Sequence, residues 1–121
     1  MKIISPTAHG ILDYATVIFL VASPTIFGME GNLCTITYSL AAVHFGLTML
    51  TDFKPGIIKV IPFRIHGLIE IIVAISLAAL AFWFYSNDDT LGFYFYMTLA
   101  VVIMLVFILT DFNSAPGIKA V

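Results

Sequence analysis

The chain contains few charged residues and one cysteine. Of its 121 residues, 10% are charged and 61% are hydrophobic, and the net charge is −2. A soluble domain of this size carries about 25% charged and about 45–50% apolar residues, so the apolar surface here exceeds what one small core can hide. The shortage of basic residues argues against nucleic acid as a partner. Cys34 alone excludes an intrachain disulfide framework and a cysteine-rich metal site within one chain. Composition therefore predicts an integral membrane protein whose main partner is the lipid bilayer.

The sequence also lacks the common catalytic motifs. It has no nucleophile elbow, no phosphate-binding glycine loop, no dinucleotide fingerprint and no His-Glu-x-x-His run. We therefore expect no enzymatic activity, no metal and no cofactor.

Four long apolar stretches fill most of the chain. Each is close to the roughly 20 residues that cross a bilayer, and backbone polar groups in lipid must be satisfied within the segment, so we expect four transmembrane α-helices. The first stretch also shares features with a cleaved signal peptide, but His9 and Asp13 interrupt it and Pro24 would follow the cleavage site. An uncleaved span is favoured. The expected spans are residues 10–29, 33–51, 65–85 and 91–110.

The basic residues predict the orientation of the spans. All of them fall near the two termini or in the connection between the second and third spans, whereas the two short turns carry only acids. Because cytoplasmic segments retain Lys and Arg, both termini and the central connection are expected in the cytoplasm, in a bacterial inner membrane. The basic residues are Lys2, Lys54, Lys59, Arg64 and Lys119.

Three sequence blocks occur twice in the same order. Their offsets are 57, 59 and 61 residues, which predicts a tandem duplication of a helical hairpin. Each repeat, about 1–60 and about 61–121, holds two spans, so the repeats are expected to be parallel within a single transmembrane domain. The blocks are His9-Gly10-Ile11-Leu12-Asp13 with His66-Gly67-Leu68-Ile69-Glu70, Thr51-Asp52-Phe53 with Thr110-Asp111-Phe112, and Pro55-Gly56-Ile57 with Pro116-Gly117-Ile118.

The end of the first span carries a family resemblance. At Ser23-Pro24-Thr25-Ile26-Phe27-Gly28 the chain resembles the SPW-repeat family of small bacterial membrane proteins. Thr25 stands where that family has tryptophan, and the second half has Leu80-Ala81-Phe82 at the equivalent place. The resemblance implies an architecture of two-span units and no particular activity.

Ionisable residues inside the spans are the candidate functional residues. Each costs about 2.5–3.5 kcal/mol to insert into a bilayer, so each requires an explanation. His and acid are spaced i, i+4 in both repeats, which puts each pair on one helix face near the cytoplasmic end. The candidates are His9, Asp13, His44, His66 and Glu70.

Three roles are open for these residues. In the first, the acids are stabilised by the positive end of the helix dipole and the cluster holds the two repeats together. In the second, the pairs handle protons, ions or a small ligand. In the third, they bind haem or a metal. The sequence favours the first role, and so predicts a small accessory or structural membrane protein. Its candidate protein partners are further copies of the same chain or a larger membrane complex. The Thr-Asp blocks are expected only to end helices.

Overall fold

The chain forms four long helices, described here from a computed structural model that covers residues 2–114. All four are long and apolar enough to cross a membrane, as expected. The third repeated block at Pro116-Gly117-Ile118, and Lys119, lie outside the described residues. The elements are α1 (Pro6–Ile26), α2 (Gly31–Leu50), β1 (Thr51–Asp52), β2 (Ile61–Pro62), α3 (Phe63–Ser86), α4 (Thr90–Leu109) and the short 3-10 helix η1 (Phe112–Ser114).

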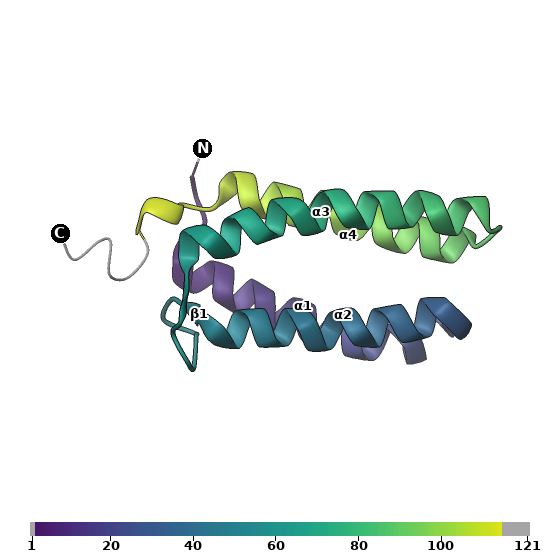
Figure 1. Cartoon of the computed structure of the whole chain (residues 1–121), viewed down its shortest axis with the longest axis horizontal. Helices are drawn as coiled ribbons and strands as arrows, with labels where there is room; N and C mark the ends of the chain where they lie inside the picture. The colour runs from purple at the N-terminus through teal and green to yellow at the C-terminus, as the bar shows by residue number, and fades with distance from the viewer. Residues whose placement is uncertain (1, 115–121) are drawn as a thin grey trace.

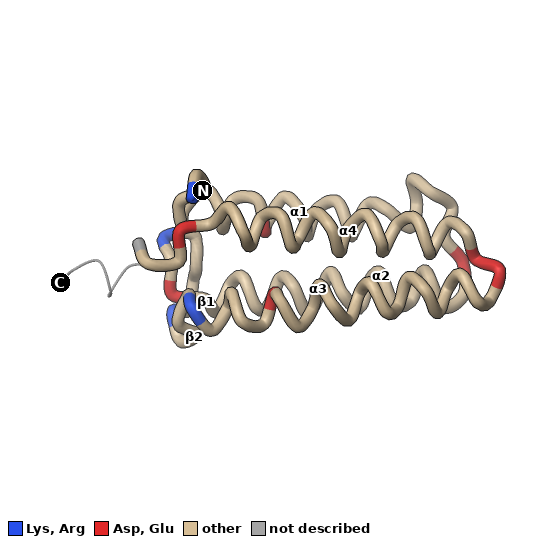
Figure 2. The backbone as a smooth tube through the Cα atoms, turned by 90° about the horizontal axis from the view of Figure 1, so that it is seen from above, with Lys and Arg blue, Asp and Glu red and all other residues tan. Residues whose placement is uncertain are grey.

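The helices pack as two hairpins. α1 packs mainly against α2, and α3 against α4, and the two hairpins lie side by side (Figure 1). We call the end that carries Lys2, the connection 51–62 and η1 the terminal end, and the end that carries the two short turns the turn end. The described Lys and Arg residues lie at the terminal end, whereas the turn end carries only acids (Figure 2).

The first helix begins four residues earlier than expected. The Ser5 side chain accepts a hydrogen bond from the Ala8 amide at 3.1 Å, and Pro6 occupies the first turn, where its missing N–H is not needed. Asp13 therefore lies in the third turn. The first turns of α1 and α3, residues 6–9 and 63–66, contain no acid. Since the helix dipole acts within the first turn, the expectation that it stabilises Asp13 and Glu70 is wrong.

An apolar core fills the turn half of the bundle. It contains one leucine from each of the four helices together with Phe84 and Tyr96. The Tyr96 hydroxyl lies 2.7 Å from the Thr37 hydroxyl, which itself donates to the Leu33 carbonyl, so Tyr96 donates to Thr37 across the two hairpins. The outer faces are also apolar, with side chains such as Ile18 and Val43 about 70% exposed. Such faces suit a lipid environment.

At the terminal end, short backbone pairings connect the hairpins. Thr51 and Asp52, which follow α2, pair in parallel with Ile61 and Pro62, which precede α3. Thr110, which follows α4, forms a parallel bridge with Ile4, which precedes α1. The end of each hairpin is thus held beside the start of the other.

Candidate functional site

Four ionisable side chains meet inside the bundle near its terminal end. The histidine side chains are fully buried and the two acidic residues are only 4% exposed. One imidazole nitrogen or carboxylate oxygen from each residue lies within 4.8 Å of the other three. At 1.5 Å per residue, the acids stand about 10 Å along α1 and α3 from the helix starts. We call this group the buried cluster, and its members are His9 and Asp13 from α1 and His66 and Glu70 from α3.

Each imidazole lies closer to the acid of the other hairpin than to the acid of its own helix. His9 Nε2 is 3.0 Å from Glu70 Oε2 and 3.4 Å from Asp13 Oδ2. His66 Nε2 is 3.0 Å from Asp13 Oδ2 and 3.8 Å from Glu70 Oε2. The i, i+4 spacing read from the sequence therefore places the residues correctly on one face, but the shortest contacts cross between hairpins.

The second nitrogen of each imidazole contacts a threonine of the opposite hairpin. His9 Nδ1 is 2.8 Å from Thr110 Oγ1, and His66 Nδ1 is 2.8 Å from Thr51 Oγ1. The backbone pairings at the terminal end account for these contacts, because they hold Thr110 beside the start of α1 and Thr51 beside the start of α3.

These threonines determine which imidazole nitrogen carries a hydrogen. The Thr51 hydroxyl donates its one hydrogen to the Leu47 carbonyl at 2.6 Å, and the Thr110 hydroxyl donates to the Val106 carbonyl at 2.5 Å. Each hydroxyl can therefore only accept from the histidine. We assign the hydrogen to Nδ1 in both rings, which directs both Nε2 atoms toward the carboxylates.

Aromatic rings cover the cluster at the terminal end. Phe63 lies against both imidazoles, with ring centroids 5.3 Å from His9 and 5.8 Å from His66. Phe53 packs on His66 and Phe112 on His9, at 5.7 Å in each case. Phe53 and Phe63 are at most 1% exposed, so the cluster is screened from the polar connection.

Gly10 and Gly67, which follow the two histidines, allow rings from the terminal end to pack closely against α1 and α3. A Cβ at Gly67 would lie 2.7 Å from the Phe112 ring, and one at Gly10 would lie 2.5 Å from the Pro55 ring and 3.0 Å from Phe53. Such distances are too short for carbon atoms that are not bonded. Only glycine therefore leaves room for these rings to pack on the helix next to each histidine.

His44 approaches the cluster from one side only. Its Nε2 is 3.7 Å from Asp13 Oδ1, the oxygen that neither of the other imidazoles uses. Its side chain is 12% exposed. All five candidate residues from the sequence therefore converge, with His44 at the edge.

The two threonines are not among the site residues predicted from the sequence. Thr51 and Thr110 were expected only at helix ends, and both are indeed the C-caps of α2 and α4. Their second role, as partners of the histidines, depends on how the hairpins dock. A signal was nevertheless present, because the threonines recur in the repeated blocks together with the histidines.

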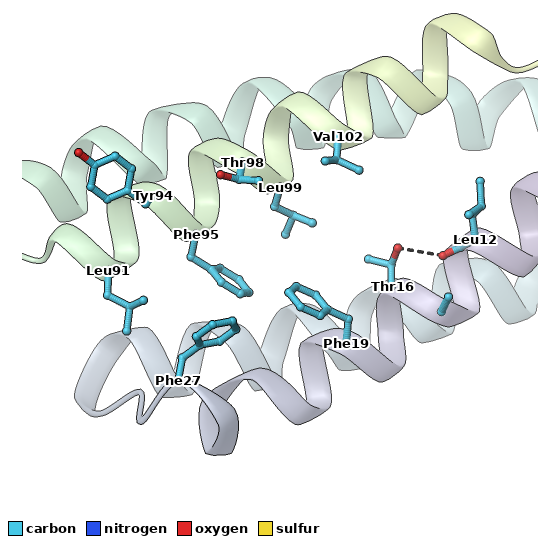
Figure 3. A pocket seen from close by; sticks show the side chains of 11 residues that line it. Leu12, Thr16, Phe19, Phe27, Leu91, Tyr94, Phe95, Thr98, Leu99 and Val102 are labelled. Carbon is cyan, nitrogen blue, oxygen red and sulfur yellow. Dashed lines mark hydrogen bonds between the residues drawn. The ribbon is translucent and has the colours of Figure 1, made fainter.

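A separate apolar groove of about 520 Å³ lies between α1 and α4, toward the turn end. Phe19, Phe27 and Phe95 point into it (Figure 3). None of the cluster residues lines this groove, and its apolar walls resemble the rest of the lipid-compatible surface.

Comparison with known proteins finds no match: no family model, curated protein or solved structure is significantly similar to this chain. The resemblance to the SPW-repeat family stays a prediction.

Proposed function

We propose that the protein is a small accessory or structural component of the cytoplasmic membrane whose two helical hairpins are joined by the buried cluster. Both termini and the connection 51–62 lie on the cytoplasmic side in this proposal, following the distribution of basic residues. The cluster then lies in the cytoplasmic half of the bilayer.

One observation carries the joining role: each imidazole hydrogen-bonds through Nδ1 to a threonine of the opposite hairpin and places Nε2 3.0 Å from a carboxylate oxygen of that hairpin. The threonines are Thr110 for His9 and Thr51 for His66. Separating the hairpins would break both imidazole–threonine hydrogen bonds and expose four ionisable groups to lipid, which is costly. The cluster therefore favours the docked arrangement of the hairpins.

The contacts also support a duplicated origin. His9 pairs with Thr110 as His66 pairs with Thr51, and Ile4 meets Thr110 as Ile61 meets Thr51. Corresponding residues of the two halves thus make corresponding contacts across the bundle, as expected of repeats that face each other.

Proton handling is the second candidate, because imidazoles alternate with carboxylates at 3.0–3.8 Å in the cluster. A relay across the membrane also needs polar groups beyond the cluster. The next buried side chains toward the turn end are Val17 and Leu20 on α1 and Ala74 and Leu77 on α3. These apolar neighbours support a static role over translocation.

The joining role is tested by replacing both acids with their amides. Asp13→Asn with Glu70→Gln keeps the side-chain volumes but removes both carboxylates, and we expect the thermal unfolding of the detergent-purified protein to shift to lower temperature. Glu30→Gln, at the turn end, is the control and should unfold like the unaltered protein. An unchanged unfolding temperature in the double variant would refute the joining role.

Two further measurements address the alternatives. In liposomes, proton flux that depends on Asp13 and Glu70 would favour the relay, whereas no flux above protein-free liposomes supports the static role. For the accessory role, purification in mild detergent should retain a defined membrane partner or a homo-oligomer, and recovery of monomer alone would argue against it.

A further inference from the structure

We propose that the buried cluster binds one divalent first-row transition-metal ion. The ligands are Nε2 of each histidine and one oxygen of each carboxylate. This inference deepens the proposed function, because the ion would then be the group that joins the two hairpins.

The spacing of the ligand atoms matches a single coordination sphere. Ions of this kind bind imidazole nitrogen and carboxylate oxygen at about 2.0–2.2 Å, so ligand atoms around a four-coordinate ion lie about 3.3–3.6 Å apart. The nitrogen–oxygen separations in the cluster are 3.0, 3.0, 3.4 and 3.8 Å, and all four ligand atoms fall within 4.8 Å of one another.

The same four atoms lack hydrogen bonds. His9 Nε2, His66 Nε2, Asp13 Oδ2 and Glu70 Oε2 are fully buried, and none makes a hydrogen bond of acceptable geometry to a residue within 2–114. The same is true of His44 Nε2 at the edge of the cluster. Buried polar atoms without partners are costly and uncommon in folded proteins. The four atoms point toward one common position and do not form hydrogen-bonded pairs. A single ion bound at that position would account for this arrangement.

The threonines complete the arrangement expected around a metal. Histidine ligands characteristically donate their other ring N–H to an acceptor, which orients the ring and keeps the ligating nitrogen free of hydrogen. Thr110 and Thr51 accept from Nδ1 of His9 and His66 in this way. Both Nε2 lone pairs are thereby directed into the cluster.

Charge balance favours a divalent ion. Two carboxylates and two neutral imidazoles carry a charge of −2, which a divalent cation cancels. Neutrality matters here because the cluster is sealed by apolar and aromatic side chains, where an unbalanced charge is strongly penalised.

The ligand types narrow the choice of ion. Two nitrogens and two carboxylate oxygens, with no sulfur, suit Zn²⁺, Fe²⁺, Mn²⁺ and Co²⁺ better than Cu(I), which prefers sulfur, or Ca²⁺ and Mg²⁺, which prefer oxygen alone. Haem fits less well, because carboxylates occupy the space between the imidazoles that a porphyrin would need.

His44 is a positioning residue in this proposal. It approaches Asp13 Oδ1, whereas Oδ2 is the oxygen near both imidazoles. At 3.7 Å from Oδ1, His44 Nε2 is beyond hydrogen-bond distance and is buried without a hydrogen-bond partner among the described residues. With the ion bound, a hydrogen bond from His44 to Oδ1 would orient the carboxylate without occupying a place on the ion.

The test uses the full chain, purified in detergent through a tag that contains no histidine and stripped with a chelator. Titration with Zn²⁺ by calorimetry, and with Co²⁺ by visible absorption, should give one ion per chain and a Co²⁺ spectrum of low coordination number. His9→Ala, His66→Ala and Asp13→Asn with Glu70→Gln should each weaken binding by more than about 100-fold, since each removes ligands. Glu30→Gln should bind like the unaltered protein.

Substitutions of residues that contact the proposed ligands distinguish a specific metal site from non-specific metal binding. Thr51→Val, Thr110→Val and His44→Ala should each weaken Zn²⁺ binding by about 10–100-fold, the usual effect of removing a group that orients a ligand. Thr51→Ser and Thr110→Ser keep the hydroxyl and should bind normally. A Co²⁺ spectrum that is the same in His9→Ala and His66→Ala as in the unaltered protein would overturn the proposed ligands.

The outcomes separate this inference from the joining role. If the stripped protein takes up no stoichiometric ion while the double acid variant still unfolds at lower temperature, the metal site is wrong and the joining role stands. If the ion binds in one equivalent but neither binding nor the acid variants change the unfolding temperature, the joining role is wrong and the metal site stands.

Discussion

His66 and Thr51 are 15 residues apart in the chain, and the imidazole N–H at Nδ1 donates to the threonine hydroxyl at 2.8 Å in the closed terminal end of the bundle. Thr51 is itself fully buried and donates onward to Leu47. The imidazole, the hydroxyl and a main-chain carbonyl thus form one short chain of hydrogen bonds that joins the end of α2 to the start of α3.

Replacing Thr51 with valine should break this chain at nearly constant volume. The Nδ1 hydrogen of His66 would then be buried without an acceptor, which costs about 1–3 kcal/mol of unfolding free energy. Chemical unfolding of the detergent-purified variant, followed by circular dichroism, measures the loss. Thr51→Ser retains the acceptor and should remain within about 1 kcal/mol of the unaltered protein. Equal stability of the valine and serine variants would contradict the assigned hydrogen bond.

Gly67 should not tolerate alanine, because the added Cβ would lie 2.7 Å from the Phe112 ring. Forcing an extra methyl group into a packed region costs about 1–3 kcal/mol. Gly46→Ala is the matched control, since a Cβ there meets no atom within 4 Å among the described residues. Within α2, four residues before its end, that substitution should be neutral or stabilising by up to about 1 kcal/mol. The same unfolding measurement compares the two variants, and equal effects would refute the close approach of Phe112.

The hydrogen bond between Tyr96 and Thr37 joins the hairpins in the turn half of the bundle. Tyr96→Phe removes one donor, while Thr37 keeps its bond to the Leu33 carbonyl, so no buried hydrogen loses its acceptor. We expect a loss of about 0.5–1.5 kcal/mol. Tyr94, which is 67% exposed, supplies the control Tyr94→Phe, expected to be close to neutral. A larger loss at position 94 than at 96 would contradict this assignment.

The orientation in the membrane can be tested in intact bacterial cells. In a Cys34→Ser background, a cysteine introduced at Asn87 should react with a membrane-impermeant maleimide. One introduced at Lys54 should react only after the cells are permeabilised. The reason is that Lys and Arg are retained in the cytoplasm. The reverse labelling pattern would place the terminal end outside and refute the proposed topology.

The sequence predicted the membrane-spanning helices and the residues of the cluster. The length of the apolar runs is enough to predict the helices, because a chain that crosses a bilayer has few alternatives to helical structure. The cluster residues could be identified because ionisable side chains are rare within such apolar runs. The start of α1 was misplaced because Ser5 and Pro6, although polar or helix-breaking in other contexts, favour the first turn of a helix. Because the helix was expected to begin about one turn too late, Asp13 was wrongly expected in the first turn, where the helix dipole acts.

By itself, then, the sequence determined that this chain has four apolar helices and that imidazoles and acids recur at matched places in them. These are properties of composition and periodicity, which a chain carries before it folds. Only the tertiary structure decided which groups meet. His9 bonds to Thr110 and lies nearest Glu70, and His66 bonds to Thr51 and lies nearest Asp13, because the backbone pairings hold the end of each hairpin beside the start of the other.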